Sequence, residues 1–237
     1  MIPASRLLID FDEKFDRFSN ESNRRLRIED KDSIINEALE IYFENKVAKA
    51  ETDSKVRQEL RPLEEKEIKL VKLEDGDTFS IFKIPKNSYK ILRSRAIVEK
   101  EGCGQKEIPL IMFQTDDLNN GRKSPYWKSS YQWEHLLADE GSKGLYVWHE
   151  NDCKIVYIII DYYRKPLEIH FPSMSANKEY IDRNGVRQTK DQGLELSNMY
   201  ARRHIIDIAD LIGRANLGDT RDYEIKLNKI INVEKLN

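Results

Sequence analysis

Residues 32–63 carry the stretch DSIINEALEIYFENKVAKAETDSKVRQELRPL. Apolar residues form a wide face in its first three turns, whereas charged residues dominate its second half and leave only a thin apolar line. This pattern predicts one long helix that begins near Asp32, a good N-cap residue, and ends before Pro62. So narrow an apolar line buries too little apolar surface to stabilise many helical turns in a monomer. We therefore expect the helix to pack on another copy or another protein.

Further helices are predicted at both ends of the chain. Residues 4–18 repeat apolar side chains at intervals of three and four, which is typical of an amphipathic helix. Residues 194–215 have a broad apolar face and predict a buried helix, and residues 219–235 predict a last short one.

The middle of the chain is typical of β-structure. Short apolar segments separated by turn residues predict strands at 68–73, 79–84, 108–113, 132–137, 145–148 and 154–163. Residues 154–163 are the most apolar, so we expect that strand to be central. Residues 91–98 fit a strand or a short helix, residues 116–130 a polar loop, and residues 174–192 an exposed loop or hairpin.

Together these elements predict an α+β protein in which long N-terminal helices and C-terminal helices pack with an antiparallel β-rich domain. We expect an N-terminal helical region over residues 1–66 and the β domain over residues 67–173. The exposed loop or hairpin then occupies residues 174–193, and the C-terminal helices occupy residues 194–237.

Composition narrows the classes of function. Charged residues make up 35% of the chain, above the usual value of about 25%, which indicates much polar contact surface. The 40 basic and 42 acidic residues give a net charge of -2, which argues against general nucleic-acid binding. Cys103 and Cys153 are expected to be two free thiols. Without a signal-peptide pattern or a bilayer-length apolar run, we expect a soluble protein made in the cytoplasm and no contact with a membrane.

Candidate chemistry is sparse. His149, Glu150 and Asp152 lie together, but their spacing matches no standard metal-ligand pattern and suggests a surface turn. The pair Asp116-Asp117 fits a turn or a helix cap better than acid–base catalysis. Cys103 has no histidine nearby in the sequence to activate it. We therefore expect no catalytic, cofactor-binding or metal-binding residue, and no enzyme activity.

One aromatic segment leaves two interpretations open. Aromatic residues at positions 126, 127, 131 and 133 alternate with basic residues at 122, 123 and 128. Such a pattern can stack single-stranded bases. The favoured interpretation is that Trp133 fills the β core while the loop residues, including Tyr126 and Trp127, form a protein interface.

Several short motifs occur in an order that resembles a known family. They are IINEAL at 34–39, LRPL at 60–63, LRSRA at 92–96, DDLN at 116–119, IDYYRKP at 160–166 and HIIDIA at 204–209. From residue 32 to residue 215 the chain resembles virion connector proteins of crAss-like, short-tailed bacteriophages. The resemblance implies a head–tail adaptor that closes into a homo-oligomeric ring of roughly twelve copies, matching a portal.

The resemblance also implies a location and partners. The protein would belong to the neck or tail of the virion, between the portal protein and the tail or other ring proteins. Genomic DNA would pass through its lumen without being read. The expected contact residues on the long helix are Val56, Arg57, Leu60, Arg61 and Leu63, with Tyr126 and Trp127 on the loop. The alternatives are a nucleic-acid-processing enzyme of unfamiliar type, using the acids named above, and a single-strand-binding module.

Overall fold

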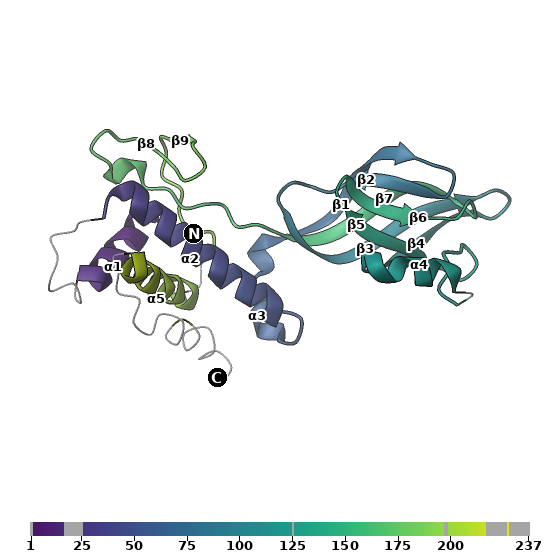
Figure 1. Cartoon of the computed structure of the whole chain (residues 1–237), viewed down its shortest axis with the longest axis horizontal. Helices are drawn as coiled ribbons and strands as arrows, with labels where there is room; N and C mark the ends of the chain where they lie inside the picture. Colours follow the sequence, from purple (N-terminus) through teal and green to yellow (C-terminus); the bar gives the residue numbers. More distant parts are fainter. Residues whose placement is uncertain (1, 17–25, 125, 197–198, 217–226, 228–237) are drawn as a thin grey trace. The chain divides into compact units, whose positions relative to one another are not determined.

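The computed structural model of the chain describes residues 2–16, 26–124, 126–196, 199–216 and 227. The chain forms two compact units, described separately below. Residues 1–62 and 166–237 make the first, called the helical unit, and residues 63–165 make the second, called the barrel unit. The chain is thus mixed α and β, with a seven-stranded barrel and several helices (Figure 1). The predicted domain boundaries at 66/67 and 173/174 lie four and eight residues after these divisions.

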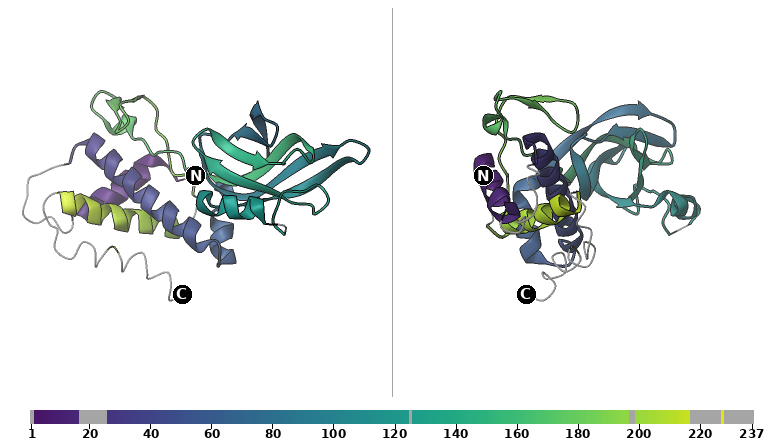
Figure 2. Two further views of the ribbon diagram at one scale, coloured as in Figure 1. Left: turned by 45° about the vertical axis from the view of Figure 1, so that its right-hand side comes forward. Right: turned by 60° about the vertical axis from the view of Figure 1, so that its left-hand side comes forward.

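Three helices build the core of the helical unit: α1 (Ala4–Asp16), α2 (Ile28–Lys49) and α5 (Met199–Asn216). Helix α5 packs against both α1 and α2 (Figures 1 and 2). The apolar residues that predicted α1 and α5 are the ones that become buried, among them Leu7, Phe11, Ile205, Ile208 and Ile212. Ion pairs run along the rims of this bundle, including Lys14 with Asp207 and Lys31 with Asp12.

The single long helix predicted over residues 32–63 is wrong. Helix α2 begins four residues earlier and ends at Lys49; a turn at residues 50–53 separates it from α3 (Ser54–Glu59), and a 3-10 turn, η1 (Arg61–Leu63), follows. The Asp53 side chain causes the restart, because it accepts the Lys55 backbone N–H at 2.8 Å and so caps α3. The second of the two predicted N-terminal helices is therefore divided into α2 and the much shorter α3. The first, predicted over residues 4–18, includes residues 17 and 18, which lie outside the described residues.

The segment after the barrel belongs to the helical unit. It contains the 3-10 turn η2 (Pro172–Met174) and a two-stranded hairpin of β8 (Tyr180–Ile181) and β9 (Arg187–Gln188). The predicted loop or hairpin at 174–192 is thus a hairpin, but Tyr180 and Asp182 within it are buried. The helix predicted at 219–235 lies outside the described residues, apart from Leu227.

Seven strands close the barrel in the order β1-β2-β6-β5-β4-β3-β7, with β7 paired again to β1. Their bounds are β1 (Glu64–Asp75), β2 (Phe79–Lys83), β3 (Ser88–Lys100), β4 (Gly104–Met112), β5 (Leu136–Gly141), β6 (Gly144–Trp148) and β7 (Lys154–Arg164). The expectation of an antiparallel domain needs one correction: β4 and β5 pair in parallel, because the connection between them contains a helix, α4 (Thr115–Lys123). That helix also replaces part of the polar loop predicted at 116–130.

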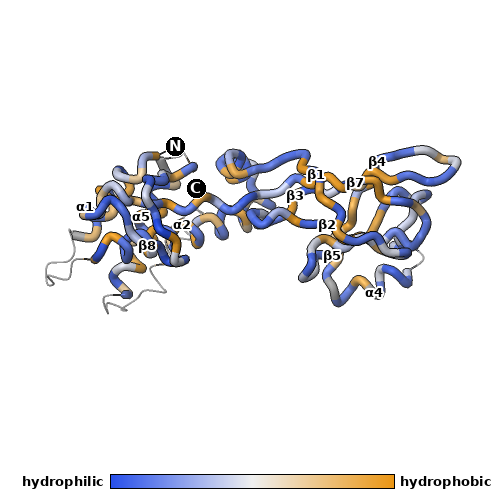
Figure 3. Tube along the Cα trace, turned by 90° about the horizontal axis from the view of Figure 1, so that it is seen from above, coloured by the Kyte–Doolittle hydropathy of each residue, from blue (hydrophilic) through white to orange (hydrophobic). Residues whose placement is uncertain are grey.

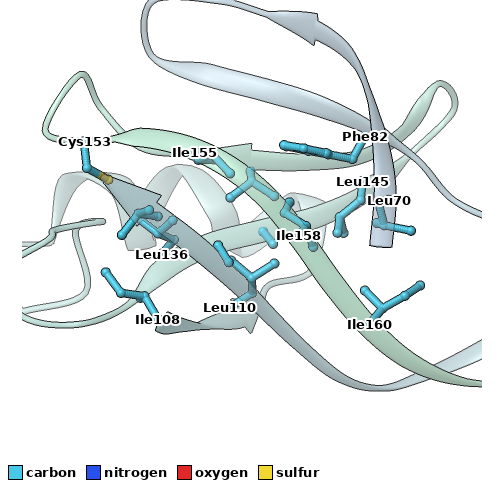
Figure 4. Packing of buried hydrophobic residues seen from close by; sticks show 14 of the residues in the cluster. Leu70, Phe82, Ile108, Leu110, Leu136, Leu145, Cys153, Ile155, Ile158 and Ile160 are labelled. Carbon is cyan, nitrogen blue, oxygen red and sulfur yellow. The ribbon is translucent and has the colours of Figure 1, made fainter. Parts of the chain in front are cut away.

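Inward-facing side chains fill the barrel. Leu70, Phe82, Ile108, Ile158 and Ile160 are among those that meet in its centre (Figure 4). Hydrophobic stretches mark β1, β4 and β7 on the hydropathy trace (Figure 3). Strand β7 pairs with β1 on one side and β3 on the other, as its apolar sequence indicates. In the part of the chain that the structure describes, no helix is long and apolar enough to cross a membrane.

Candidate interface on the barrel unit

The most exposed aromatic residues of the barrel unit lie on the connection between α4 and β5. Tyr126 is 83% exposed, Trp127 is 51% exposed and Trp133 is 69% exposed. The prediction that Trp133 fills the β core is therefore wrong. A strand was predicted at 132–137, but the observed strand β5 begins only at Leu136. The Trp133 backbone therefore lies in the turn before β5, and strand alternation does not direct its side chain inwards. These three residues are called the aromatic loop below.

Hydrogen bonds hold the backbone of the aromatic loop. The Asp152 carboxylate accepts the Tyr131 N–H at 2.7 Å. The Tyr131 hydroxyl donates to the carbonyl oxygens of Cys103 and Gly104, at 3.3 and 3.2 Å. The two ring nitrogens of His135 each lie 3.2 Å from a carbonyl oxygen, one of Trp127 and one of Trp133. The loop is therefore tied to the β3–β4 turn and to the start of β7, although its large side chains are exposed.

Basic residues occur near the same loop. Lys106 Nζ lies 3.9 Å from the centre of the Tyr131 ring and 3.2 Å from a Glu134 carboxylate oxygen. Lys123 and Lys128 are exposed beside the tryptophans in sequence. Trp127 meets the Phe113 ring edge-on, with 6.3 Å between ring centres, which anchors one side of its indole. The loop thus combines apolar area with positive charge, a mixture suited to binding either a protein or a stacked base.

The predicted contact residues of the 54–63 segment lie differently. Val56, Leu60 and Leu63 are buried within the chain. The Arg57 guanidinium donates to the Ala50 carbonyl oxygen from Nε at 3.3 Å and from Nη2 at 3.2 Å, and so caps the end of α2. Arg61 is exposed. A neighbouring molecule can therefore reach Arg61 directly but not the three buried apolar side chains.

An ion pair fastens α3 further. Lys46 of α2 is 6% exposed, and its Nζ lies 2.9 Å from a Glu59 carboxylate oxygen. Both residues line a cavity of about 360 Å³ beside α3. These two charges are thus paired with each other within the chain.

The candidate catalytic acids have structural partners. Glu150 pairs with Arg122 at 2.6 Å, and Asp152 pairs with Lys100, which lowers the pKa of the Asp152 carboxyl. His149 is buried, and burial lowers its pKa. Its Nε2 lies 3.3 Å from the hydroxyl of Ser80. Asp116 and Asp117 occupy the first turn of α4, where carboxylates interact favourably with the positive end of the helix dipole.

Sequence reasoning missed the hydroxyl in that contact. Ser80 is fully buried, and its hydroxyl donates to Asp75 Oδ1 at 2.7 Å. Ser80 of β2 thus contacts Asp75 of β1 and His149, which follows β6, and its hydroxyl is not accessible from solvent.

A group able to hold a metal lies in the helical unit, where the sequence suggested none. Glu168, His170 and Asp182 each place one possible ligand atom within 4.8 Å of the others. No local spacing marks this group, because the 3-10 turn η2 and strand β8 separate Glu168 and His170 from Asp182.

Comparison of the chain with protein-family models and with curated proteins finds no match in either.

Proposed function

We propose that the protein is a structural component of a tailed-phage virion, one subunit of a homo-oligomeric ring that joins the portal to the tail. The family resemblance of residues 32–215 suggests this assignment. The ring would contain roughly twelve copies in the neck, a number set by the symmetry of the portal it meets. Genomic DNA would pass through its lumen without sequence-specific contact.

The observation that carries the proposal is the aromatic loop. Tyrosine and tryptophan are the residue types that dominate the energetics of protein interfaces. Here they are exposed on a backbone already held by hydrogen bonds, so binding a partner costs less ordering entropy than it would for a free loop. Tyr126 and Trp127 keep their place as expected contact residues, and Trp133 joins them.

The charge balance is consistent with self-association. A ring places identical neighbours side by side, and 40 basic against 42 acidic residues leave little net repulsion between them. Head-to-tail rings use two different complementary faces on each subunit. The aromatic loop would supply one, and the exposed Arg61 belongs to the candidate second face.

Mass measurement tests the assembly. The purified chain is weighed by native mass spectrometry alone and after mixing with portal protein, and a closed ring on the portal is the expected product. Trp127→Ala and Trp133→Ala should each weaken assembly by about 30-fold or more, since truncating a hot-spot residue costs about 2 kcal/mol or more. Trp127→Phe and Trp133→Phe are the matched controls and should retain most of it. A chain that stays monomeric with portal present would overturn the proposal.

The exposure of Trp133 also favours a second candidate, a single-strand-binding module. Base stacking contributes about 1–3 kcal/mol per base, and Lys123 and Lys128 lie close in sequence to the same loop. A fluorescence titration with a single-stranded oligonucleotide at several salt concentrations separates the two functions. Tight binding that weakens steeply with salt supports the module, whereas a flat titration together with ring formation removes it.

A further inference from the structure

A buried polar network joins the first half of α2 to the segment that follows the barrel. Asn36 is fully buried, and its side chain amide pairs with the Ile169 backbone: Nδ2 donates to the carbonyl oxygen at 2.9 Å, and Oδ1 accepts the N–H at 2.7 Å. This pairing fixes the backbone between Glu168 and His170. It thereby brings both side chains to α2, beside the β8–β9 hairpin that carries Asp182.

The three side chains converge on one point. His170 Nε2 lies 3.9 Å from Glu168 Oε2, and the nearest ligand atoms of Glu168, His170 and Asp182 all lie within 4.8 Å of one another. His170 is 8% exposed and Asp182 is 7% exposed, while the Glu168 side chain is 30% exposed and gives an approach from solvent. For bonds of about 2.0–2.1 Å, ligand atoms in a tetrahedral zinc site are roughly 3.3 Å apart, so the side chains would draw in by up to about 1.5 Å.

Asp32 lies behind the His170 imidazole and provides a second, independent observation. It is 1% exposed, and its Oδ1 lies 3.3 Å from His170 Nδ1 while accepting the Tyr180 hydroxyl at 2.7 Å. Its Oδ2 is buried with no hydrogen-bond partner among the described residues. A carboxylate on one ring nitrogen of a histidine whose other nitrogen faces acidic ligands is the arrangement found around protein-bound metals, where it fixes the tautomer and the ring orientation.

The charges of the network are out of balance. Three carboxylates, those of Asp32, Glu168 and Asp182, face the imidazole. The Arg183 guanidinium lies 2.9 Å from Glu168 Oε1 and is shared with Glu40 at 2.7 Å. Since buried carboxylates without a matching cation are costly, a divalent cation would offset much of this excess.

Neutral donors also orient the two carboxylate ligands, in addition to the Arg183 contact with Glu168 Oε1. The Asn184 amide donates to both Glu168 oxygens, at 3.1 and 3.0 Å. Asp182 Oδ1 accepts the backbone N–H groups of Asn184 and Val186, both at 2.9 Å, and its Oδ2 accepts from Gln188 Nε2 at 2.6 Å. Glu168 Oε2 and Asp182 Oδ2 each accept one hydrogen bond and so keep a lone pair for coordination, whereas Glu168 Oε1 and Asp182 Oδ1 each accept two or more.

We propose that Glu168, His170 and Asp182 bind one first-row divalent cation, with Asp32 positioning His170. One imidazole and two carboxylates suit zinc or manganese better than calcium or magnesium, which prefer oxygen ligands alone. The ion would cross-link the 168–182 segment and so stabilise the docking of the hairpin on α2. The site is independent of the ring proposal, because binding can be measured on the unassembled chain.

Calorimetric titration of the full, chelator-treated chain with zinc chloride tests the site, with manganese and magnesium chlorides in parallel. The expected result is one zinc ion per chain, weaker manganese, no magnesium, and a raised melting temperature with zinc. His170→Gln and Asp182→Asn should abolish the binding. Asp32→Asn should weaken it by about 10–100-fold, as expected for an outer carboxylate partner. Glu40→Gln is the matched control, because Glu40 contacts Arg183 but none of the ligands, and it should bind as the wild type does.

A second measurement uses only the wild-type protein, so it does not require that the variants fold. Wild-type crystals soaked in zinc should show an anomalous peak between His170 Nε2 and the carboxylates of Glu168 and Asp182. The proposal is wrong if zinc does not bind, if the peak lies elsewhere, or if folded His170→Gln protein keeps its affinity.

Discussion

The Asn36–Ile169 pairing predicts a large and specific loss of stability on Asn36→Ala. The substitution removes two hydrogen bonds and leaves the Ile169 N–H and carbonyl groups without partners at a position that is fully buried. Each unsatisfied buried group costs about 1–3 kcal/mol, so the free energy of unfolding should fall by about 2–6 kcal/mol. With an m-value of about 1–3 kcal/mol per M, even the smaller loss moves the urea midpoint by roughly 1 M.

Urea unfolding followed by circular dichroism at 222 nm is the assay, because α1, α2 and α5 supply most of the described helix. The three tryptophans, at positions 127, 133 and 148, all belong to the barrel unit, so their fluorescence reports on that unit in the same titration.

Asn45→Ala is the matched control on the same helix. Asn45 Nδ2 donates to the Ile41 carbonyl oxygen at 2.7 Å, within one turn, and alanine has the better helix propensity. We expect that variant to change stability by less than about 0.5 kcal/mol. If Asn36→Ala costs no more than Asn45→Ala, the reasoning that this amide holds the 168–170 backbone against α2 is refuted.

Three further outcomes are expected in the barrel unit. Gly144→Ala should destabilise the barrel by more than about 1 kcal/mol in tryptophan-monitored unfolding, since φ is +144° and the new Cβ would lie 2.2 Å from the Phe82 carbonyl oxygen; an unchanged midpoint would contradict this. Burial raises the pKa of the Cys153 thiol to about 11, so iodoacetamide at pH 8 should label the exposed Cys103 first and Cys153 roughly tenfold or more slowly, as peptide mass mapping would show. Burial lowers the pKa of His149 in the folded chain, so as the pH falls the unfolded chain binds a proton at this residue before the folded chain does. The wild type should therefore be more stable above the usual histidine pKa of 6.5 and lose that stability as the pH falls below it, and His149→Gln should flatten this slope in unfolding curves measured across that range.

Local sequence patterns were enough to predict the helices and strands whose buried residues recur at a regular spacing along the chain. The three-and-four spacing in residues 4–18 predicted α1, and the apolar run at 154–163 predicted the strand that pairs on both sides. The restart at Asp53 also had a local signal, since an aspartate before Ser54 is a good N-cap, but the charge pattern of an uninterrupted helix concealed it. Trp133 was assigned to the core by residue type, which states a preference for burial and not a position in the fold.

Residue order alone determined the existence of the amphipathic helices and of most of the strands, because each depends on side chains within a few positions of one another. Tertiary structure alone decided the closure of the barrel, the parallel pairing of β4 with β5, the exposure of the aromatic loop and the meeting of Asp32 with His170. These features join groups separated by many residues, and such groups become neighbours only when buried apolar faces and hydrogen-bonded backbone select one arrangement of the whole chain.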